Sequence, residues 1–168
     1  ANANPRILQL IAANGLGADC VSGGEIKAAL AAGFPANQIV YAGVGKSDWE
    51  INLGLDNDIF CFNVESAAEL EVIQELAAAK GKVAPIALRI NPEVDAHTHA
   101  KITTGMKENK FGINLSQIGG VFERIKQMDH VKLIGLHCHI GSQITDMSAF
   151  RNLAIRMNEI QEELAAHG

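Results

Sequence analysis

Paired cysteines are missing from this sequence. It contains three cysteines, Cys20, Cys61 and Cys138, and no two of them form a Cys-x-x-Cys pair. An odd number of widely spaced cysteines argues against a disulfide framework. Because free cysteines are among the most often buried residues, we expect three reduced thiols on strands of the core.

Clustered positive charge and long apolar runs are missing too. Fourteen Lys and Arg residues against nineteen Asp and Glu residues give a formal net charge of −5, whereas nucleic-acid binding requires clustered basic residues. No segment resembles a signal peptide or an apolar span of about 20 residues. We therefore expect a cytoplasmic protein that binds neither nucleic acid nor a membrane.

Helical and strand patterns alternate along the whole sequence. The 168 residues suffice for one domain, but they are few for a closed eight-stranded α/β barrel of about 250 residues. The predicted strands are 18–22, 39–43, 59–64, 86–91 and 132–140. The predicted helices are 5–13, 25–32, 115–128 and 147–166, with two more starting near 48 and 65. Strands separated by single helices indicate βαβ crossovers and a parallel sheet.

Side-chain parity distinguishes a barrel from an open sheet. Along 86–91, Ile86, Leu88 and Ile90 share an apolar face, and Arg89 lies on the other. An open doubly wound sheet, covered by helices on both faces, would show nearly continuous apolar strands. A face that turns polar toward the C-terminal end is typical of the inside of a barrel, where active sites lie. We predict fold class α/β, as a partial (β/α)8 TIM barrel with about five parallel strands.

The last predicted strand follows the same rule. Its bulky apolar face would be Ile134, Leu136, Cys138 and Ile140, and its opposite face Leu133, Gly135, His137 and His139. The polar side chains expected to line the mouth of the barrel are Asp19, Asn63, Arg89, Asn91 and His139.

Arg89 is the most informative charge in the sequence. A guanidinium that points into a barrel needs a carboxylate or phosphate partner, because an unpaired buried charge is very costly. Asp19 points into the same mouth, and Glu25 begins the next helix. We interpret the three as a polar cluster that orients a cofactor. The alternative is a buried ion pair that only closes the core.

The segment His137-Cys138-His139 admits two functional interpretations. Two histidines on one strand face could bind a metal, as in many metal-dependent hydrolases, although there the pair lies on the first strand. Alternatively, His139 stacks on a planar cofactor with His137 one layer deeper. Gly141 and Ser142 follow at once, and a Gly–Ser turn at a strand end has the backbone freedom and the hydroxyl of a phosphate site.

Two other segments have features of ligand-binding loops. The run Gly43-Val44-Gly45-Lys46-Ser47 looks like a nucleotide P-loop, but that motif needs a glycine where Val40 stands. Residues 93–112 are long for a strand-to-helix loop, and such loops tend to be functional. Their histidines, His97 and His99, are either functional or simply exposed.

With these motifs assembled, the sequence resembles the fold-type III pyridoxal-phosphate-dependent decarboxylases, and within them the diaminopimelate decarboxylase branch. The similarity spans nearly the whole chain. Its most specific parts are LHCHIGSQI at Leu136–Ile144 and RINPEVDAHTHAKITTGMKENKFGI at Arg89–Ile113, with GADCVSGGEI at Gly17–Ile26 in support.

The resemblance implies an enzyme, a decarboxylase that converts meso-diaminopimelate to L-lysine and CO2 with pyridoxal 5′-phosphate as cofactor. His139 would stack on the pyridine ring, and Ser142 with Gly141 would bind the phosphate. The polar network around the cofactor would be Asp19, Glu25 and Arg89, with Arg89 also a cofactor ligand. No metal is expected.

Several parts of the family pattern lie outside the 168 residues. The lysine that carries the cofactor would immediately precede Ala1, and the glycine-rich phosphate loop would follow Gly168. We therefore expect residues 1–168 to be part of the barrel domain, to lack the C-terminal β domain, and to be inactive alone. The resemblance also implies a homodimer for the full-length enzyme.

Other functions remain open from the sequence. Sister decarboxylases act on ornithine, arginine or carboxynorspermidine, and a non-enzymatic pyridoxal-phosphate carrier has the same barrel. The strings HIGSQ and THAKITTG favour diaminopimelate, whereas the residues that would read the far end of the substrate lie outside this chain.

Overall fold

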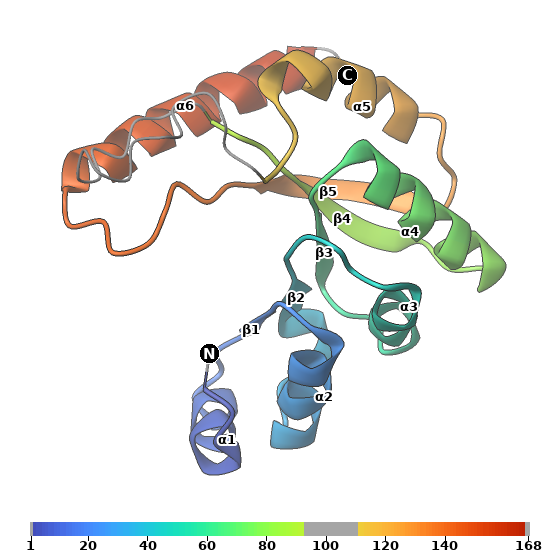
Figure 1. The fold of residues 1–168 in the computed structure, drawn as a ribbon, viewed down its shortest axis with the longest axis vertical. Coiled ribbons are helices and arrows are strands. Elements are labelled where there is room, and N and C mark those ends of the chain that lie inside the picture. The colour runs from blue at the N-terminus through green and yellow to red at the C-terminus, as the bar shows by residue number, and fades with distance from the viewer. Residues whose placement is uncertain (1, 93–110, 167–168) are drawn as a thin grey trace.

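The computed structural model describes residues 2–92 and 111–166 (Figure 1). Ala1, the loop histidines His97 and His99, and most of the Arg89–Ile113 motif lie outside these ranges.

The chain alternates helices and strands as the sequence predicts. The strands are β1 (Ala18–Cys20), β2 (Ile39–Tyr41), β3 (Cys61–Val64), β4 (Ala84–Arg89) and β5 (Val131–His137). The α-helices are α1 (Pro5–Ala13), α2 (Gly23–Ala32), α3 (Asp48–Asp56), α4 (Ala67–Ala79), α5 (Leu115–Ile125) and α6 (Met147–Ala166), and a short 3-10 helix, η1, spans Ala36–Gln38.

The five strands form one parallel sheet in the order β1-β2-β3-β4-β5. A doubly wound sheet reverses its strand order at a switch point, because its helices cover both faces. Here each strand pairs with the next one in the chain, as in a barrel that winds in one direction. The predicted partial TIM barrel is therefore confirmed.

The helices between the strands lie on one side of the twisted sheet, and α2, α3 and α4 follow each other from the bottom of the view upward (Figure 1). The core lies between this helical layer and the sheet. Its fully buried side chains include Ile26, Ile39, Ile51, Phe62, Leu70, Ile73, Ile86 and Leu88. The opposite face of the sheet carries the polar strand ends.

Three helices in succession begin with the same local motif. Each has a serine at its N-cap and a glutamate three residues later, which is the pattern of a capping box. The pairs are Ser22–Glu25 for α2, Ser47–Glu50 for α3 and Ser66–Glu69 for α4. Because each of these helices follows the end of a strand, the motif places three carboxylates along the carboxyl ends of the strands.

The parity predicted for the last strand is wrong in part. Pairing between β4 and β5 shifts register, so that Ile86 faces Leu133 while Ala87 faces Gly135. Ile134 is therefore the extra residue of a bulge, and it is 41% exposed instead of buried. A bulge reverses the parity of the residues before it relative to those after it. The strand also ends at His137, so His139 lies beyond it.

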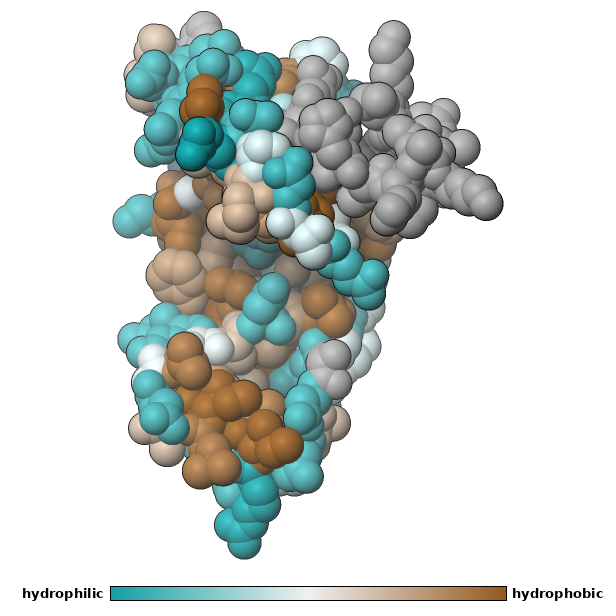
Figure 2. Space-filling view, turned by 90° about the vertical axis from the view of Figure 1, so that its left-hand side faces the viewer, coloured by the Kyte–Doolittle hydropathy of each residue, from teal (hydrophilic) through white to brown (hydrophobic). Residues whose placement is uncertain are grey.

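The side that faces left in Figure 1 is shown in Figure 2. Apolar side chains gather at its lower end, over α1, where Ile7 is 40% and Leu10 is 65% exposed. None of the helices in the described ranges is both long and apolar enough to cross a membrane.

Candidate functional site

Polar side chains meet at the carboxyl ends of the strands, as parity predicts. Arg89, the last residue of β4, pairs in register with His137, the last residue of β5. Asn63 on β3 faces Ala87 on β4, and Asp19 lies on β1. His139 follows the end of β5 by two residues. These five residues therefore lie at one end of the sheet.

Arg89 is held from several sides. Its Nη1 donates to Glu65 Oε1 over 2.7 Å, and the guanidinium carbon lies 5.6 Å from the centre of the Phe111 ring. The backbone of Ile113 donates to the Arg89 carbonyl over 2.8 Å. The predicted carboxylate partner thus exists, but it is Glu65, a residue that the sequence interpretation did not select.

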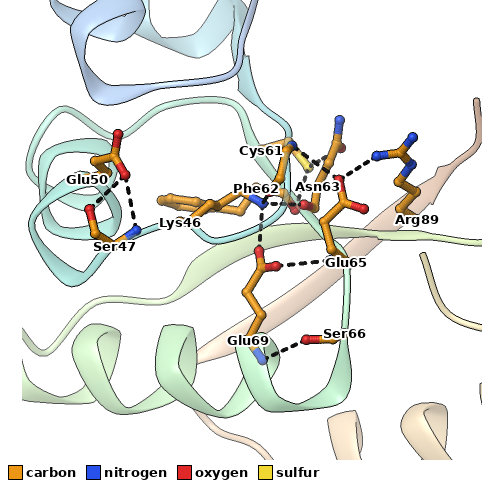
Figure 3. Close-up of polar contacts among 11 residues, drawn as sticks. Lys46, Ser47, Glu50, Cys61, Phe62, Asn63, Glu65, Ser66, Glu69 and Arg89 are labelled. Atoms are coloured by element: carbon orange, nitrogen blue, oxygen red, sulfur yellow. Dashed lines mark hydrogen bonds and ion pairs between the residues drawn. The ribbon is translucent and has the colours of Figure 1, made fainter. Parts of the chain in front are cut away.

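Glu65 directly follows β3, and its side chain is only 3% exposed. Besides Arg89, its Oε1 accepts a hydrogen bond of 3.1 Å from the backbone N–H of Gly43, which follows β2. The carboxylate therefore connects the ends of three neighbouring strands (Figure 3). Its other oxygen, Oε2, is buried and has no hydrogen-bond partner among the described residues.

Lys46 lies beside Glu65 and is buried as well, with a side chain that is 1% exposed. Its ammonium donates to Glu69 Oε1 at 2.6 Å and to the backbone carbonyls of Gly43 and Asn63 at 2.8 and 2.7 Å. Burial raises the pKa of Glu69, and this effect outweighs the opposing attraction of Lys46. All three donors of the ammonium are used, so Lys46 is a structural cation.

This geometry explains why the run from Gly43 to Ser47 is not a phosphate loop. Instead of facing a ligand, its lysine is directed into the ion pair with Glu69. The signal that could have identified Glu69 is the spacing Ser66-x-x-Glu69. For Glu65 the signal is only its position directly after a buried strand.

The two other predicted acids lie on either side of the loop between β1 and α2, with Asp19 on β1 and Glu25 in the first turn of α2. Asp19 is exposed, whereas Glu25 is partly buried and its Oε2 accepts 2.7 Å from the backbone N–H of Val21. The structure does not pair either acid with Arg89 among the described residues. The start of α2 is tied to α3, because Glu50 Oε1 accepts a 2.7 Å hydrogen bond from the Gly23 N–H.

The two histidines have different surroundings. His137 is partly buried, and its Nδ1 is enclosed without a hydrogen-bond partner among the described residues. Burial lowers the pKa of His137, and the charge of Arg89 lowers it further, against the opposing charges of Asp19 and Glu65. Both effects favour the neutral form of His137. His139 is exposed.

For the metal alternative, the described residues contain no group of three His, Cys, Asp or Glu side chains arranged to hold an ion.

After His139 the chain makes a turn that only flexible backbone allows. Gly141 has φ +131°, and the following Ser142 is exposed. A glycine with positive φ brings backbone N–H groups close to a ligand, and Ser142 adds a hydroxyl. Donors of these kinds can bind an anionic group beyond the carboxyl end of β5.

Comparison with known proteins agrees with this arrangement. A family model described as "Pyridoxal-dependent decarboxylase, pyridoxal binding domain" matches residues 1–168. The diaminopimelate decarboxylase of Bacteroides thetaiotaomicron is 64% identical over 166 residues, which cover 99% of this chain and 43% of that protein. The corresponding protein of Aquifex aeolicus is 44% identical over 168 residues, which cover 100% of this chain and 40% of the relative.

A solved structure has the same fold. The diaminopimelate decarboxylase of Helicobacter pylori complexed with L-lysine superposes with a TM-score of 0.93 at 43% identity, covering 100% of this chain and 43% of that chain. This chain therefore spans less than half the length of the relatives that it matches.

Proposed function

Since this chain belongs to the family of pyridoxal-dependent decarboxylases, matching its pyridoxal-binding domain over every residue, we propose that the protein decarboxylates meso-diaminopimelate to L-lysine. The observation that supports this most strongly is that Arg89 and the Gly141–Ser142 turn, which can donate hydrogen bonds to a phosphorylated cofactor, lie at the end of β4 and beyond the end of β5. They do so in a chain that is 64% identical to a diaminopimelate decarboxylase. In this proposal, residues 1–168 are part of the (β/α)8 barrel domain.

The side chains at the mouth fit pyridoxal phosphate chemically. Gly141 and Ser142 have the backbone and the hydroxyl that hold a phosphate, and the exposed ring of His139 can lie against a planar ring. Among the described residues Arg89 uses one guanidinium nitrogen, for Glu65, so its other donors can serve a ligand. Lys46 is not the lysine that carries the cofactor, because its ammonium is fully bonded.

The bound cofactor would supply an electron sink for the charge left on the α-carbon when CO2 departs. The task of the described residues is orientation. His139 would lie against the ring, Ser142 and Gly141 would hold its phosphate end, and Arg89 would bind it from β4. Asp19 and Glu25 complete the polar network from the β1 side.

We also propose a homodimer in the cytoplasm. All three cysteines are free, and Cys20 and Cys61 are buried as thiols, which suits a reducing compartment. The homodimer is inferred from the similarity of the sequence motifs to the family. Sedimentation of the full-length protein would test it, and a monomer at micromolar concentration would contradict it.

The activity is tested with the full-length protein, pyridoxal phosphate and meso-diaminopimelate, by measuring CO2 release and L-lysine formation. Ornithine, arginine and carboxynorspermidine are tested in parallel at equal concentrations. We expect kcat/KM for diaminopimelate to exceed the others by at least about 100-fold, because a buried polar group left unpaired by the wrong substrate is costly. Preference for another amine would identify a sister decarboxylase. Cofactor binding without CO2 release from any substrate would identify a carrier.

A further inference from the structure

We propose that Glu65 is a positioning residue for Arg89: it fixes the guanidinium at the mouth of the barrel through one oxygen and leaves the remaining guanidinium donors for the cofactor. The inference rests on the proposed function for the identity of the ligand. It concerns a group of buried charged residues that have no role in the proposed function so far: Glu65, Lys46 and Glu69.

The first argument is the geometry of the Glu65–Arg89 contact. A single nitrogen, Nη1, is engaged with Glu65 Oε1 at 2.7 Å, although arginine and carboxylate commonly pair through two parallel hydrogen bonds. A one-point contact sets the position of the guanidinium and keeps its other donors unused by Glu65. The Arg89 side chain remains 14% exposed, against 3% for Glu65, so the pair is open on the arginine side.

The second argument is that Glu65 is itself held rigidly. Its backbone N–H donates to Glu69 Oε2 at 3.2 Å, and Oε1 also accepts from the Gly43 N–H. Lys46 binds Glu69 together with the carbonyls of Gly43 and Asn63. The ion pair Lys46–Glu69 thus forms a frame around Glu65, which Figure 3 shows between β3 and the start of α4.

The third argument is energetic. Two ion pairs, in which three side chains are at most 10% exposed, lie side by side and are linked through the Glu65 N–H and Glu69. Buried ion pairs contribute little net stability, because desolvation offsets their attraction, and apolar replacements are often as stable. The charges are therefore better explained by orientation than by stability. They lie at the end of the sheet where His137 faces Arg89 across the β4–β5 pair.

The experiment is a double-mutant cycle in the full-length protein, with Glu65→Gln, Arg89→Gln and the double variant. The first measurement is the dissociation constant of pyridoxal phosphate from the apoprotein, followed by absorbance. Each single variant should weaken binding by about tenfold, as expected for loss of one charge-assisted hydrogen bond. Because Glu65 acts through Arg89, the double variant should also be about tenfold weaker, not about 100-fold.

A matched control separates positioning from stability. Gly54→Ala crowds Phe62 on the helix-covered face of the sheet, opposite the polar strand ends, and should lower stability with less than about a twofold change in cofactor affinity. The second measurement is kcat at saturating cofactor. For Glu65→Gln it should stay reduced, because a mobile Arg89 misorients the bound cofactor even when every site is filled.

Additive effects in the cycle, or wild-type cofactor affinity and kcat for Glu65→Gln, would overturn the inference. If Glu65→Gln does not fold, Glu65→Asp takes its place, since it keeps the charge but withdraws it from Arg89. The binding cycle needs no substrate. If the proposed activity is wrong, the wild-type protein would bind the cofactor but release no CO2. The cofactor dissociation constants of the four proteins in the cycle could still be compared.

Discussion

Glu50 on α3 accepts a 2.7 Å hydrogen bond from the backbone N–H of Gly23, the first residue of α2. The same carboxylate caps its own helix through the N–H and hydroxyl of Ser47. These contacts, led by the Gly23 hydrogen bond, lower the pKa of Glu50 from 4.5 to about 2. One side chain therefore joins two successive helices next to the loop that separates Asp19 on β1 from Glu25 on α2.

This contact predicts a pH-dependent loss of stability. Since the folded-state pKa is below the unfolded value, Glu50 stabilises the fold above about pH 4.5, and this contribution is lost as pH falls toward 2. Glu50→Gln should cost about 1–2 kcal/mol of unfolding free energy at pH 7 and much less at pH 3. Urea unfolding at both pH values measures this, with exposed Glu75→Gln as control. An equal cost at both would contradict it.

The thiols should be unreactive in the folded protein. Burial raises the pKa of both Cys20 and Cys61 to about 11, and it raises that of Cys138 as well. Because the thiolate is the reactive form, only about 0.1% of Cys20 or Cys61 is reactive at pH 8. An aromatic disulfide reagent should label these two cysteines at least about 100-fold more slowly than after unfolding in urea. Labelling at the rate of the unfolded chain would contradict their burial.

Two glycine substitutions should change stability in opposite directions. A Cβ on Gly54 would lie 2.7 Å from Phe62 Cζ and 2.9 Å from Ile59 Cδ1, so Gly54→Ala should destabilise by about 1–3 kcal/mol. Gly119 is in α5 with no atom within 4 Å of such a Cβ, so Gly119→Ala should stabilise by about 0.5–1 kcal/mol. Thermal unfolding of both variants tests the pair. A stabilising Gly54→Ala would show that α3 does not approach β3 this closely.

At the proposed cofactor site, substitutions of His139 and Ser142 should differ in their effects on cofactor affinity and turnover. His139→Ala removes a stacked ring worth about 0.5–1.5 kcal/mol, so cofactor affinity should fall modestly and turnover further. Ser142→Ala removes a phosphate donor worth about 1.5–3 kcal/mol, so it should mainly weaken cofactor binding. The measurements are the cofactor dissociation constant and turnover at saturating cofactor in the full-length protein. Normal turnover of saturated His139→Ala would refute the stacking role.

Local sequence determined most of the fold. The alternation of apolar strands with helices predicted the five parallel strands, and the side-chain parity of 86–91 predicted that Arg89 lies opposite the core. Parity is a property of a single strand, so it needs no knowledge of neighbours. It failed at Ile134, because a bulge depends on how β5 fits against β4.

The sequence by itself thus determined the fold class, the polar mouth and the Ser-x-x-Glu starts of α2, α3 and α4. Only the tertiary structure decided the partners of the charges. Arg89 and Glu65 are 24 residues apart in the sequence, and Gly43 and Glu65 are 22 residues apart. Each carboxylate near the mouth was chemically able to pair with Arg89, and the choice depended on the register of β3 against β4. Long-range pairing follows from that register, which no local pattern encodes.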